Sequence, residues 1–222
     1  MAPRTAARLS RGLIVATALD LSDTTRGDGG EFPTGQAIGR ALSVDRSSIW
    51  RHFADQDDLL IELADAMMKT VVEQTDGIAD AEDLLRRLWW ATFDAFARHA
   101  HVGARVAARF IAGENVAQLI ERILWALNEI GFDTETAARY QRAFSDLMLA
   151  AAAAHASYLL ETAQQRDSDQ ASYDRALRSL SPTRFPLIAA SLEAKVEYDT
   201  AALGDLIFET FLAGMLASRP ET

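Results

Sequence analysis

The stretch TGQAIGRALSVDRSSIWRHFADQDDLLIEL, residues 34–63, predicts two short helices joined by a tight turn and followed directly by a longer third helix. The first segment carries a small apolar stripe at helical spacing, whose members are Ala37, Ile38, Ala41 and Leu42. Val44 is expected to fill the space between the two short helices. Asp45 is a suitable N-cap for the second of them.

The second short helix is expected from Arg46 to about Phe53, with Ile49 and Phe53 buried at positions i and i+4. Its exposed side then carries the polar and aromatic residues Arg46, Ser47, Ser48, Trp50, Arg51 and His52. Arginine and serine contact base edges and phosphates when such a helix enters the DNA major groove. The stretch therefore predicts a helix-turn-helix unit that binds duplex DNA, and we add Thr34, at its start, to the expected contacts.

These residues resemble the tetracycline-repressor (TetR) family of bacterial transcription regulators. The resemblance lies in IGRALSV at residues 38–44, SIWRHF at 48–53 and DDLL at 57–60, and by motif it covers about residues 8–66. The corresponding family patterns run roughly Ile-Ala-x-x-Leu-Gly-Val, Thr-Leu-Tyr-x-His-Phe and Lys-x-x-Leu-Leu. The resemblance implies that Trp50 contacts DNA and that His52 touches a phosphate.

Five features depart from the family pattern. Gly39 stands where alanine is usual, Ser43 where the turn usually has glycine, and Trp50 where tyrosine is usual. Gln56 replaces a lysine, which removes one charge that would neutralise a phosphate. The Gly-rich loop over residues 22–33 is a few residues longer than usual, and we expect it to be mobile.

The composition of the 222-residue chain favours an all-α fold, because alanine and leucine abound while glycine and proline are scarce. The chain has no cysteine, so neither disulfides nor thiolate chemistry are available, and a cytoplasmic protein is expected. The longest apolar run, residues 147–154, is too short to span a bilayer, and the N-terminus lacks the apolar core of a signal peptide. No phosphate-binding loop or nucleophile motif indicates an enzyme, and we expect no cofactor.

The charge is distributed unevenly. Residues 1–53 hold seven arginines and five acidic residues, a net charge of +2, whereas residues 54–222 hold 15 basic and 27 acidic residues, a net charge of −12. The arginines available to follow a phosphate backbone are Arg4, Arg8, Arg11, Arg40, Arg46 and Arg51. A mildly basic head on an acidic body is typical of a modular DNA-binding protein, although acidic surface also simply aids solubility.

Two domains are expected: a DNA-binding domain over residues 1–54, and a larger helical ligand-binding and dimerisation domain over 55–222. A helix over residues 55–76, capped by Asp55, is predicted to connect them. Before the helix-turn-helix unit we expect a helix over residues 4–21. In the second domain we expect helices near 81–100, 102–112, 115–130, 134–164, 168–180 and 200–218.

Aromatic residues recur at helical spacing in the second domain. On spacing alone they are plain core, but the TetR family uses this half as an inducer pocket. The predicted pocket residues are Trp89, Phe93, Phe96, Arg105, Phe110, Trp125, Phe144, Met148 and His155. A metal site is not expected, because the histidines of His99-x-His101 point to different sides of a helix.

The last predicted helix is apolar on two faces, which fits a helix buried in its own subunit and in a partner. The predicted homodimer contacts are Leu203, Ile207, Phe211 and Met215, with Ala150 and Ala154 of the long helix before it. A central helix of a monomer is the alternative. These observations favour a ligand-responsive transcription regulator, more a repressor than an activator, released from operator DNA by a small, largely apolar or aromatic molecule. The competing hypothesis is a helical interaction or ligand-binding module without sequence-specific DNA binding.

Overall fold

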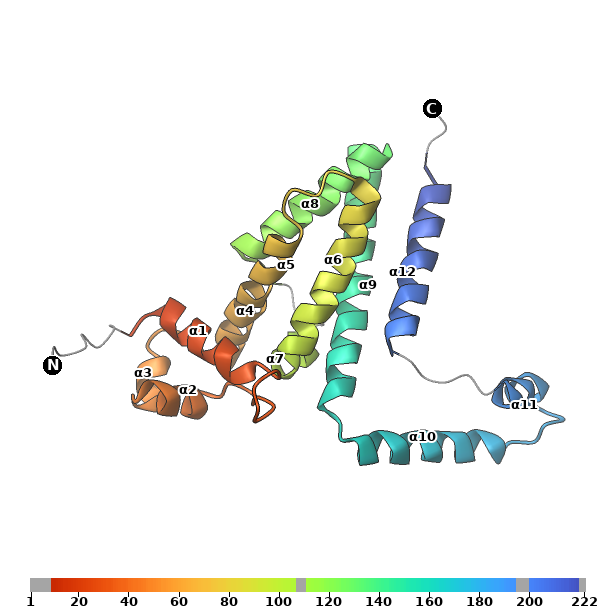
Figure 1. The fold of residues 1–222 in the computed structure, drawn as a ribbon, viewed down its shortest axis with the longest axis horizontal. Coiled ribbons are helices and arrows are strands. Elements are labelled where there is room, and N and C mark those ends of the chain that lie inside the picture. The colour runs from red at the N-terminus through yellow and green to blue at the C-terminus, as the bar shows by residue number, and fades with distance from the viewer. Residues whose placement is uncertain (1–8, 107–110, 195–199, 220–222) are drawn as a thin grey trace.

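The computed structural model describes residues 9–106, 111–194 and 200–219, and within these ranges the regular structure is entirely α-helical. Three short helices form a unit at the N-terminal end (Figure 1): α1 (Arg11–Ser22), α2 (Gly35–Leu42) and α3 (Arg46–Ile49). We call α1–α3 the reading unit. The all-α architecture with a small N-terminal unit and a larger helical body is confirmed.

The body is built on α4 (Gln56–Met67), α5 (Lys69–Gln74), α6 (Ala81–Arg98), α7 (Ala100–Val106), α8 (Glu114–Ile130), α9 (Thr134–Leu160) and α12 (Thr200–Ala217). The helices α6 and α9 run side by side, α8 covers one side of this pair, and α12 stands on the other (Figure 1). The helices α10 (Ala163–Arg178) and α11 (Pro186–Glu193) pack on each other and extend away from the body.

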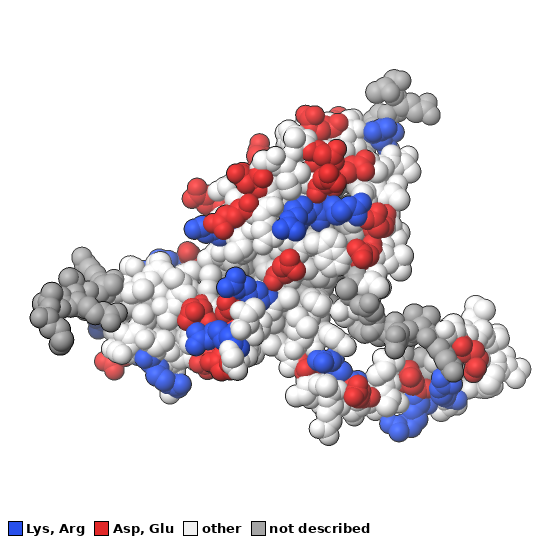
Figure 2. Space-filling model, in the orientation of Figure 1, with Lys and Arg blue, Asp and Glu red and all other residues white. Residues whose placement is uncertain are grey.

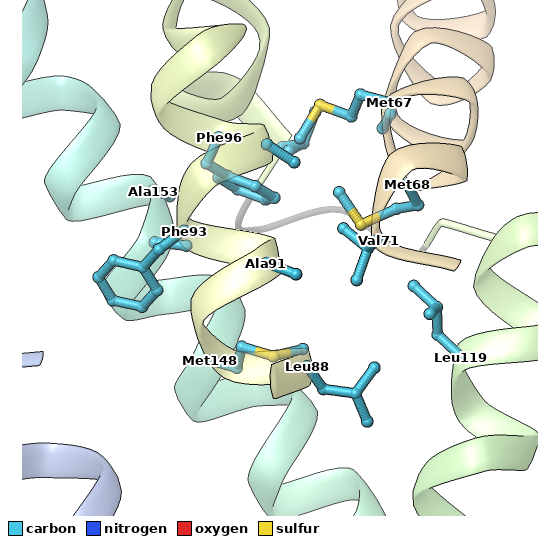
Figure 3. Close-up of a cluster of buried hydrophobic side chains, with 14 of the residues drawn as sticks. Met67, Met68, Val71, Leu88, Ala91, Phe93, Phe96, Leu119, Met148 and Ala153 are labelled. Carbon is cyan, nitrogen blue, oxygen red and sulfur yellow. The ribbon is translucent and has the colours of Figure 1, made fainter. Parts of the chain in front are cut away.

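The core of the body joins the connector to the larger domain. Figure 3 shows Met67, Met68 and Val71 of α4 and α5 facing Leu88 and Phe96 of α6, and all five side chains are buried. Burying a side chain of this size contributes about 1.5–3 kcal/mol relative to its exposure. The α4–α5 segment is therefore an integral part of the body rather than a free linker.

Several helices begin where the sequence supplies an N-cap. The side chains of Thr34, Asp55, Asp80 and Asp133 each accept a hydrogen bond from a backbone N–H in the first turn of the helix that follows. Asp58, three residues after the N-cap Asp55, also accepts a hydrogen bond from the backbone N–H of Ala54, at 2.9 Å. The connector therefore begins with an arrangement related to a capping box, in which two side chains bond to free backbone N–H groups.

The helix boundaries differ from the expected ones in several places. The helix α1 begins after Ser10, whose hydroxyl accepts from the backbone N–H of Leu13, and residues 4–8 of the expected helix lie outside the described residues. The connector is interrupted at Met68, where the backbone N–H bonds to Asp65 in a tighter turn. The helix expected over 134–164 ends at Leu160. The helix expected over 168–180 begins earlier, as α10 runs over Ala163–Arg178. The helix α11 was not predicted; it begins with Pro186, at a first helical position that suits proline.

The helix α9 is long and apolar enough, by length and composition, to cross a bilayer, which the shorter apolar run had not indicated. It packs against α6, α7 and α8, so part of its apolar surface belongs to the core. It also packs against α12, and part of its apolar surface stays exposed, including Ala150 and Ala154.

Candidate DNA-reading unit and ligand cavity

Arg11 fastens the reading unit to the connector. Its guanidinium donates to the backbone carbonyl of His52 at 2.6 Å, to Asp58 at 3.1 Å and to Glu62 at 2.7 Å, and it lies over the ring of Phe53. The hydrogen bond from Arg11 is the main reason that the pKa of Asp58 is lowered. Both terminal nitrogens of Arg11 are thus engaged within the chain, which argues against the expected contact with a phosphate backbone. Arg4 and Arg8 lie outside the described residues.

The arginines of the turn region have a different environment. Arg40, Arg46 and Arg51 are exposed, and no ion pair involving them occurs within the described part of the chain. Ser47 is exposed between them, whereas Ser48 and His52 are half-buried. The unit thus presents exposed cationic donors, which binding to phosphates and base edges requires.

The helix α3 is shorter than predicted, ending at Ile49 and continuing as a turn through His52. Ile49 and Phe53 are buried as expected. Asp45 occupies the N-cap position, but its side chain makes no capping hydrogen bond. The side chain of Trp50 is half-buried instead of exposed, because it packs on Gly35, where an added Cβ would lie 2.6 Å from the indole ring.

The turn between α2 and α3 is held in an unusual conformation. Ser43 has φ of 56° and ψ of 42°, in the left-handed region where glycine is the favoured residue. The backbone N–H of Val44 bonds to the carbonyl of Gly39 at 2.9 Å. An added Cβ at Gly39 would lie 2.8 Å from the Val44 carbonyl oxygen, so the departure from alanine permits this close turn.

Two further positions of the expected DNA surface are now placed. The Thr34 hydroxyl accepts from the backbone N–H of Ala37 and stays on an exposed residue, so its proton is left to donate. The Gln56 side chain turns inward, where its Nε2 is buried without a hydrogen-bond partner within the described residues. Gln56 is therefore not placed as a phosphate contact.

The loop between α1 and α2 is attached to the end of α6. Arg98 donates to Asp23 at 2.7 Å, and the backbone N–H of Thr24 donates to the carbonyl of Arg98 at 2.8 Å. Burial of Asp23 raises its pKa, but the hydrogen bonds from Arg98 and Thr25 outweigh burial and bring the pKa to about 2. The first residues of the loop, which was expected to be mobile, are thus bonded to the end of α6.

His99 follows Arg98 at the end of α6. Its Nδ1 lies 3.0 Å from the hydroxyl of Ser22, and burial lowers the pKa of the imidazole. Arg105, a predicted pocket residue, instead lies over the ring of Phe32 at 4.1 Å and bonds to the carbonyl of His101. Both side chains connect the body with the loop after α1, so they do not line the cavity.

A cavity of about 70 Å³ lies between α6, α9 and the first turns of α12. Its lining consists of Phe93, Ala151, Ala154, His155, Thr200, Leu203, Gly204 and Ile207. Two predicted pocket residues, Phe93 and His155, are among them, and their rings lie 5.7 Å apart. The other lining residues were not predicted for the pocket, and three of them were assigned to the dimer contact instead: Ala154, Leu203 and Ile207.

Polar atoms without partners lie in this part of the body. Within the described residues, His155 Nδ1, Trp89 Nε1 and Thr92 Oγ1 are buried with no hydrogen-bond partner. Burial lowers the pKa of His155, more than the nearby Asp94 raises it, so its imidazole is neutral at pH 7. A buried group without a partner costs about 1–3 kcal/mol, which a bound molecule with a complementary group would offset.

The other predicted pocket residues lie elsewhere. Trp89, Phe96, Phe144 and Met148 are buried in the packed core, and Trp125 is 37% exposed on α8. Phe110 lies outside the described residues. Sequence spacing identified a buried aromatic set correctly but could not separate side chains that fill the core from those that border a cavity.

The predicted dimer residues are divided between two environments. Met215 is buried within its own chain, and the ring of Phe211 packs on that of Phe144 with centroids 5.9 Å apart. Leu203 and Leu206 are exposed, as are Ala150 and Ala154 of α9. An uncovered apolar surface thus exists on α9 and α12, but Met215 is not part of it.

Many acidic side chains of the body lie away from the reading unit. Figure 2 shows acidic side chains gathered over the end of the body that is farthest from α1–α3. A helix-turn-helix unit with exposed arginines, attached to a larger helical body, is the architecture of a DNA-binding transcription regulator.

Comparison with known proteins agrees with this class. Residues 63–218 match the family model described as the tetracyclin repressor-like C-terminal domain, and the chain belongs to the TetR family of transcription regulators. No curated protein sequence is significantly similar to it.

Solved structures with this fold cover nearly the whole chain. ActR from Streptomyces coelicolor, without ligand, has a TM-score of 0.78 and 23% identity, covering 97% of this chain and 100% of that one. ActR in complex with actinorhodin has a TM-score of 0.75 at 23% identity, with the same coverage. A TetR variant from Acinetobacter baumannii AYE in complex with minocycline has a TM-score of 0.65 and 18% identity, covering 96% and 100%.

Proposed function

We propose that this protein is a homodimeric repressor that leaves its operator DNA when a small, largely apolar or aromatic molecule binds the body. The observation that carries the proposal is the contrast between the arginines of the reading unit. The guanidinium of Arg11 bonds to groups of its own chain, whereas Arg46 and Arg51 are exposed beside the turn. Exposed cations that serve no internal contact fit a DNA partner.

The reading unit would enter the major groove with α3. Arg46 and Ser47, exposed at its start, would reach base edges, while Arg51 and His52, which follow it, would contact phosphates. Thr34 would donate its hydroxyl proton to a phosphate at the start of α2. Trp50 would contribute mainly by fixing α3 against Gly35, with the exposed part of its ring directed to DNA.

The effector would occupy the cavity between α6, α9 and α12. Its volume of about 70 Å³ is below the roughly 150 Å³ of a cavity that holds benzene, so α12 must move outward for a ring to enter. The ring of Phe93 would stack with the molecule, and His155 would bond a hydroxyl or similar group on it. The binding of actinorhodin and minocycline by proteins of similar fold supports an effector with ring systems.

Dimerisation would use the surface of α9 and α12 that the chain leaves uncovered. In a dimer with twofold symmetry, the two α3 helices would meet successive turns of the major groove, about 34–36 Å apart. An effector that displaces α12 would then alter both the cavity and the interface. The coupling between effector and operator is reciprocal, so operator DNA weakens effector binding by the same factor.

Selection of binding sites from a random duplex library by the purified protein tests the proposal. We expect an inverted-repeat sequence to be enriched and its binding to weaken steeply with salt. A protein that enriches no sequence would contradict the regulator and favour an interaction module. Native mass spectrometry of the protein purified from its host then tests the effector, since a bound small molecule should be retained by the parent and lost from His155→Phe. A parent protein that carries nothing, and a cavity that admits no aromatic compound, would contradict ligand control.

A further inference from the structure

The helix α8 begins without a capping side chain of its own. It follows Gly113, which occupies the N-cap position and offers no side chain to the first turn. Free backbone N–H groups at a helix start need an acceptor. Here the acceptor comes from the connector: Asp65 of α4 takes a hydrogen bond from the backbone N–H of Val116 at 2.9 Å and another from the Asn115 side chain at 2.9 Å.

This contact depends on the absence of a side chain at position 113. A Cβ added to Gly113 would lie 2.1 Å from the Asp65 carboxyl carbon and 2.4 Å from its Oδ1. The backbone of Gly113 is extended, with φ of −157°, so the conformation itself would accept alanine. The glycine is therefore needed for the space that Asp65 occupies, and not for backbone freedom.

The same two segments are joined a second time at the other end of the connector. Arg122 of α8 donates to the carbonyl of Val72 at 2.5 Å, near the end of α5, and to Asp76 at 3.1 Å. Asp65 of the connector thus bonds to the backbone at the start of α8, and Arg122 of α8 bonds to the backbone near the end of α5. The α4–α5 connector and α8 are fixed to each other at two separate points.

The connector in turn carries the reading unit. Asp58 and Glu62, one or two turns before Asp65 on α4, bind Arg11 of α1, and α4 begins directly after the turn that follows α3. On the other side, α8 packs against α6 and α9, which border the cavity. Asp65 is therefore at the junction between the body and the helix that sets the orientation of α1–α3.

We propose that Asp65 is a positioning residue for DNA binding: by capping α8 it fixes the angle of α4, and hence the separation of the two reading units in a dimer. The inference rests on the proposed function. Loss of this cap should change recognition of a two-part site much more than it changes contact with DNA in general. Contact with random duplex uses single phosphates and does not depend on the spacing of two units.

The test measures binding to two duplexes, the sequence selected by the parent protein from a random library and a scrambled version of it. Asp65→Ala should lower affinity for the selected duplex about tenfold, within the range typical of coupling between sites, and leave affinity for the scrambled duplex within about twofold. Asp65→Asn keeps one acceptor for Val116 and should recover most of the loss.

Asp133→Ala is the matched control. Asp133 caps α9 by accepting from the backbone N–H of Thr136 at 2.8 Å, so its removal costs a helix cap far from the connector. Both alanine variants should lose similar stability in urea denaturation. Only Asp65→Ala should lose discrimination between the two duplexes, because a purely structural role would affect the two variants alike.

A double-mutant cycle identifies the contact itself. Gly113→Ala should reproduce the loss of discrimination, since its Cβ expels Asp65 from the cap. If one contact is responsible, Asp65→Ala combined with Gly113→Ala should be no worse than either single variant. Additive losses would overturn the assignment of both residues to one contact.

The outcomes separate this inference from the proposed function. A parent protein that selects no sequence overturns the proposed function, and the inference with it. A parent that selects a sequence, with Asp65→Ala discriminating as well as the parent, overturns the inference alone. Equal loss of discrimination in Asp133→Ala would also overturn it, because a general loss of stability would then account for the effect.

Discussion

The carboxylate of Asp23 and the guanidinium of Arg98 lie 2.7 Å apart and join the loop after α1 to the last turn of α6. Asp23 is almost completely buried, while Arg98 is partly open to solvent. Thr25 adds two hydrogen bonds to the same carboxylate, from its backbone N–H and its hydroxyl. This pair attaches the loop of the reading unit to the body by a contact separate from the connector.

The first prediction concerns acid stability. The pKa of Asp23 is about 2 in the folded protein against 3.8 for an ordinary aspartate, so the folded state favours the charged form. This contribution, about 2 kcal/mol, is complete above pH 4 and is lost as the pH falls from about 4 to 2. Urea denaturation of the parent and of Asp23→Asn should give free energies of unfolding that differ at pH 6 and converge near pH 2. A constant difference over this range would contradict the assignment.

The second prediction concerns the turn of the reading unit. Gly39→Ala would normally stabilise a helix by up to about 1 kcal/mol, but the new Cβ would meet the Val44 carbonyl oxygen at 2.8 Å. That oxygen belongs to the backbone of a tight turn and cannot move alone, so we expect a net loss of about 1 kcal/mol or more. Gly12→Ala, in α1 with no atom within 4 Å of the added Cβ, is the control and should be neutral or stabilising. Thermal unfolding of both variants decides between the two effects.

How much the sequence predicts depends on the distance along the chain between the residues involved. Helix caps such as those at Thr34, Asp55 and Asp133 can be predicted from local sequence, because each joins residues three apart. The caps that Asp65 provides for α8 and the pair of Asp23 with Arg98 join residues 51 and 75 apart, and no local pattern signals them. The reading unit was therefore predictable as a motif, whereas its attachment to the body was not.

The candidate sites show the same limit. The spacing of Phe93 identified it as a buried aromatic residue, but its place beside a cavity follows from how closely α12 approaches α6. Trp50 is less exposed than its position on the helix predicts for a similar reason, because the indole packs on Gly35 of a different helix. Helical periodicity predicts which face is buried, but not which neighbour buries it.

The third prediction separates base contact from phosphate contact. Arg46→Ala should lower affinity for the selected duplex by about 1–3 kcal/mol and relax the preference at one base pair. Arg40→Ala, at an exposed position near the end of α2, should lower affinity for selected and scrambled duplexes alike and reduce the salt slope by about one unit. Gel-shift titrations at several salt concentrations give both quantities. Equal behaviour of the two variants would show that Arg46 does not contact a base.

The last prediction concerns the uncovered surface of α12. Leu206 is 63% exposed in the single chain, so a charge placed there costs little unless a partner covers it. If α12 forms the dimer interface, Leu206→Glu buries an unpaired carboxylate between subunits, which costs several kcal/mol or separates them. The variant should then sediment as a monomer with unchanged helical content, and its affinity for the two-part selected duplex should fall while weak binding to scrambled DNA persists.

Two comparisons make this experiment specific to α12. Phe211→Glu is the less informative change, because the Phe211 ring packs on Phe144 and Tyr140 of its own chain and its loss should lower the melting temperature directly. Leu187→Glu, on α11 at a residue that is 83% exposed, places the same charge on the projecting arm. Sedimentation velocity of the three variants should give a monomer for Leu206→Glu and a dimer for Leu187→Glu. The reverse result would assign the interface to α11, because the added carboxylate separates the subunits only where the partner covers the leucine that it replaces.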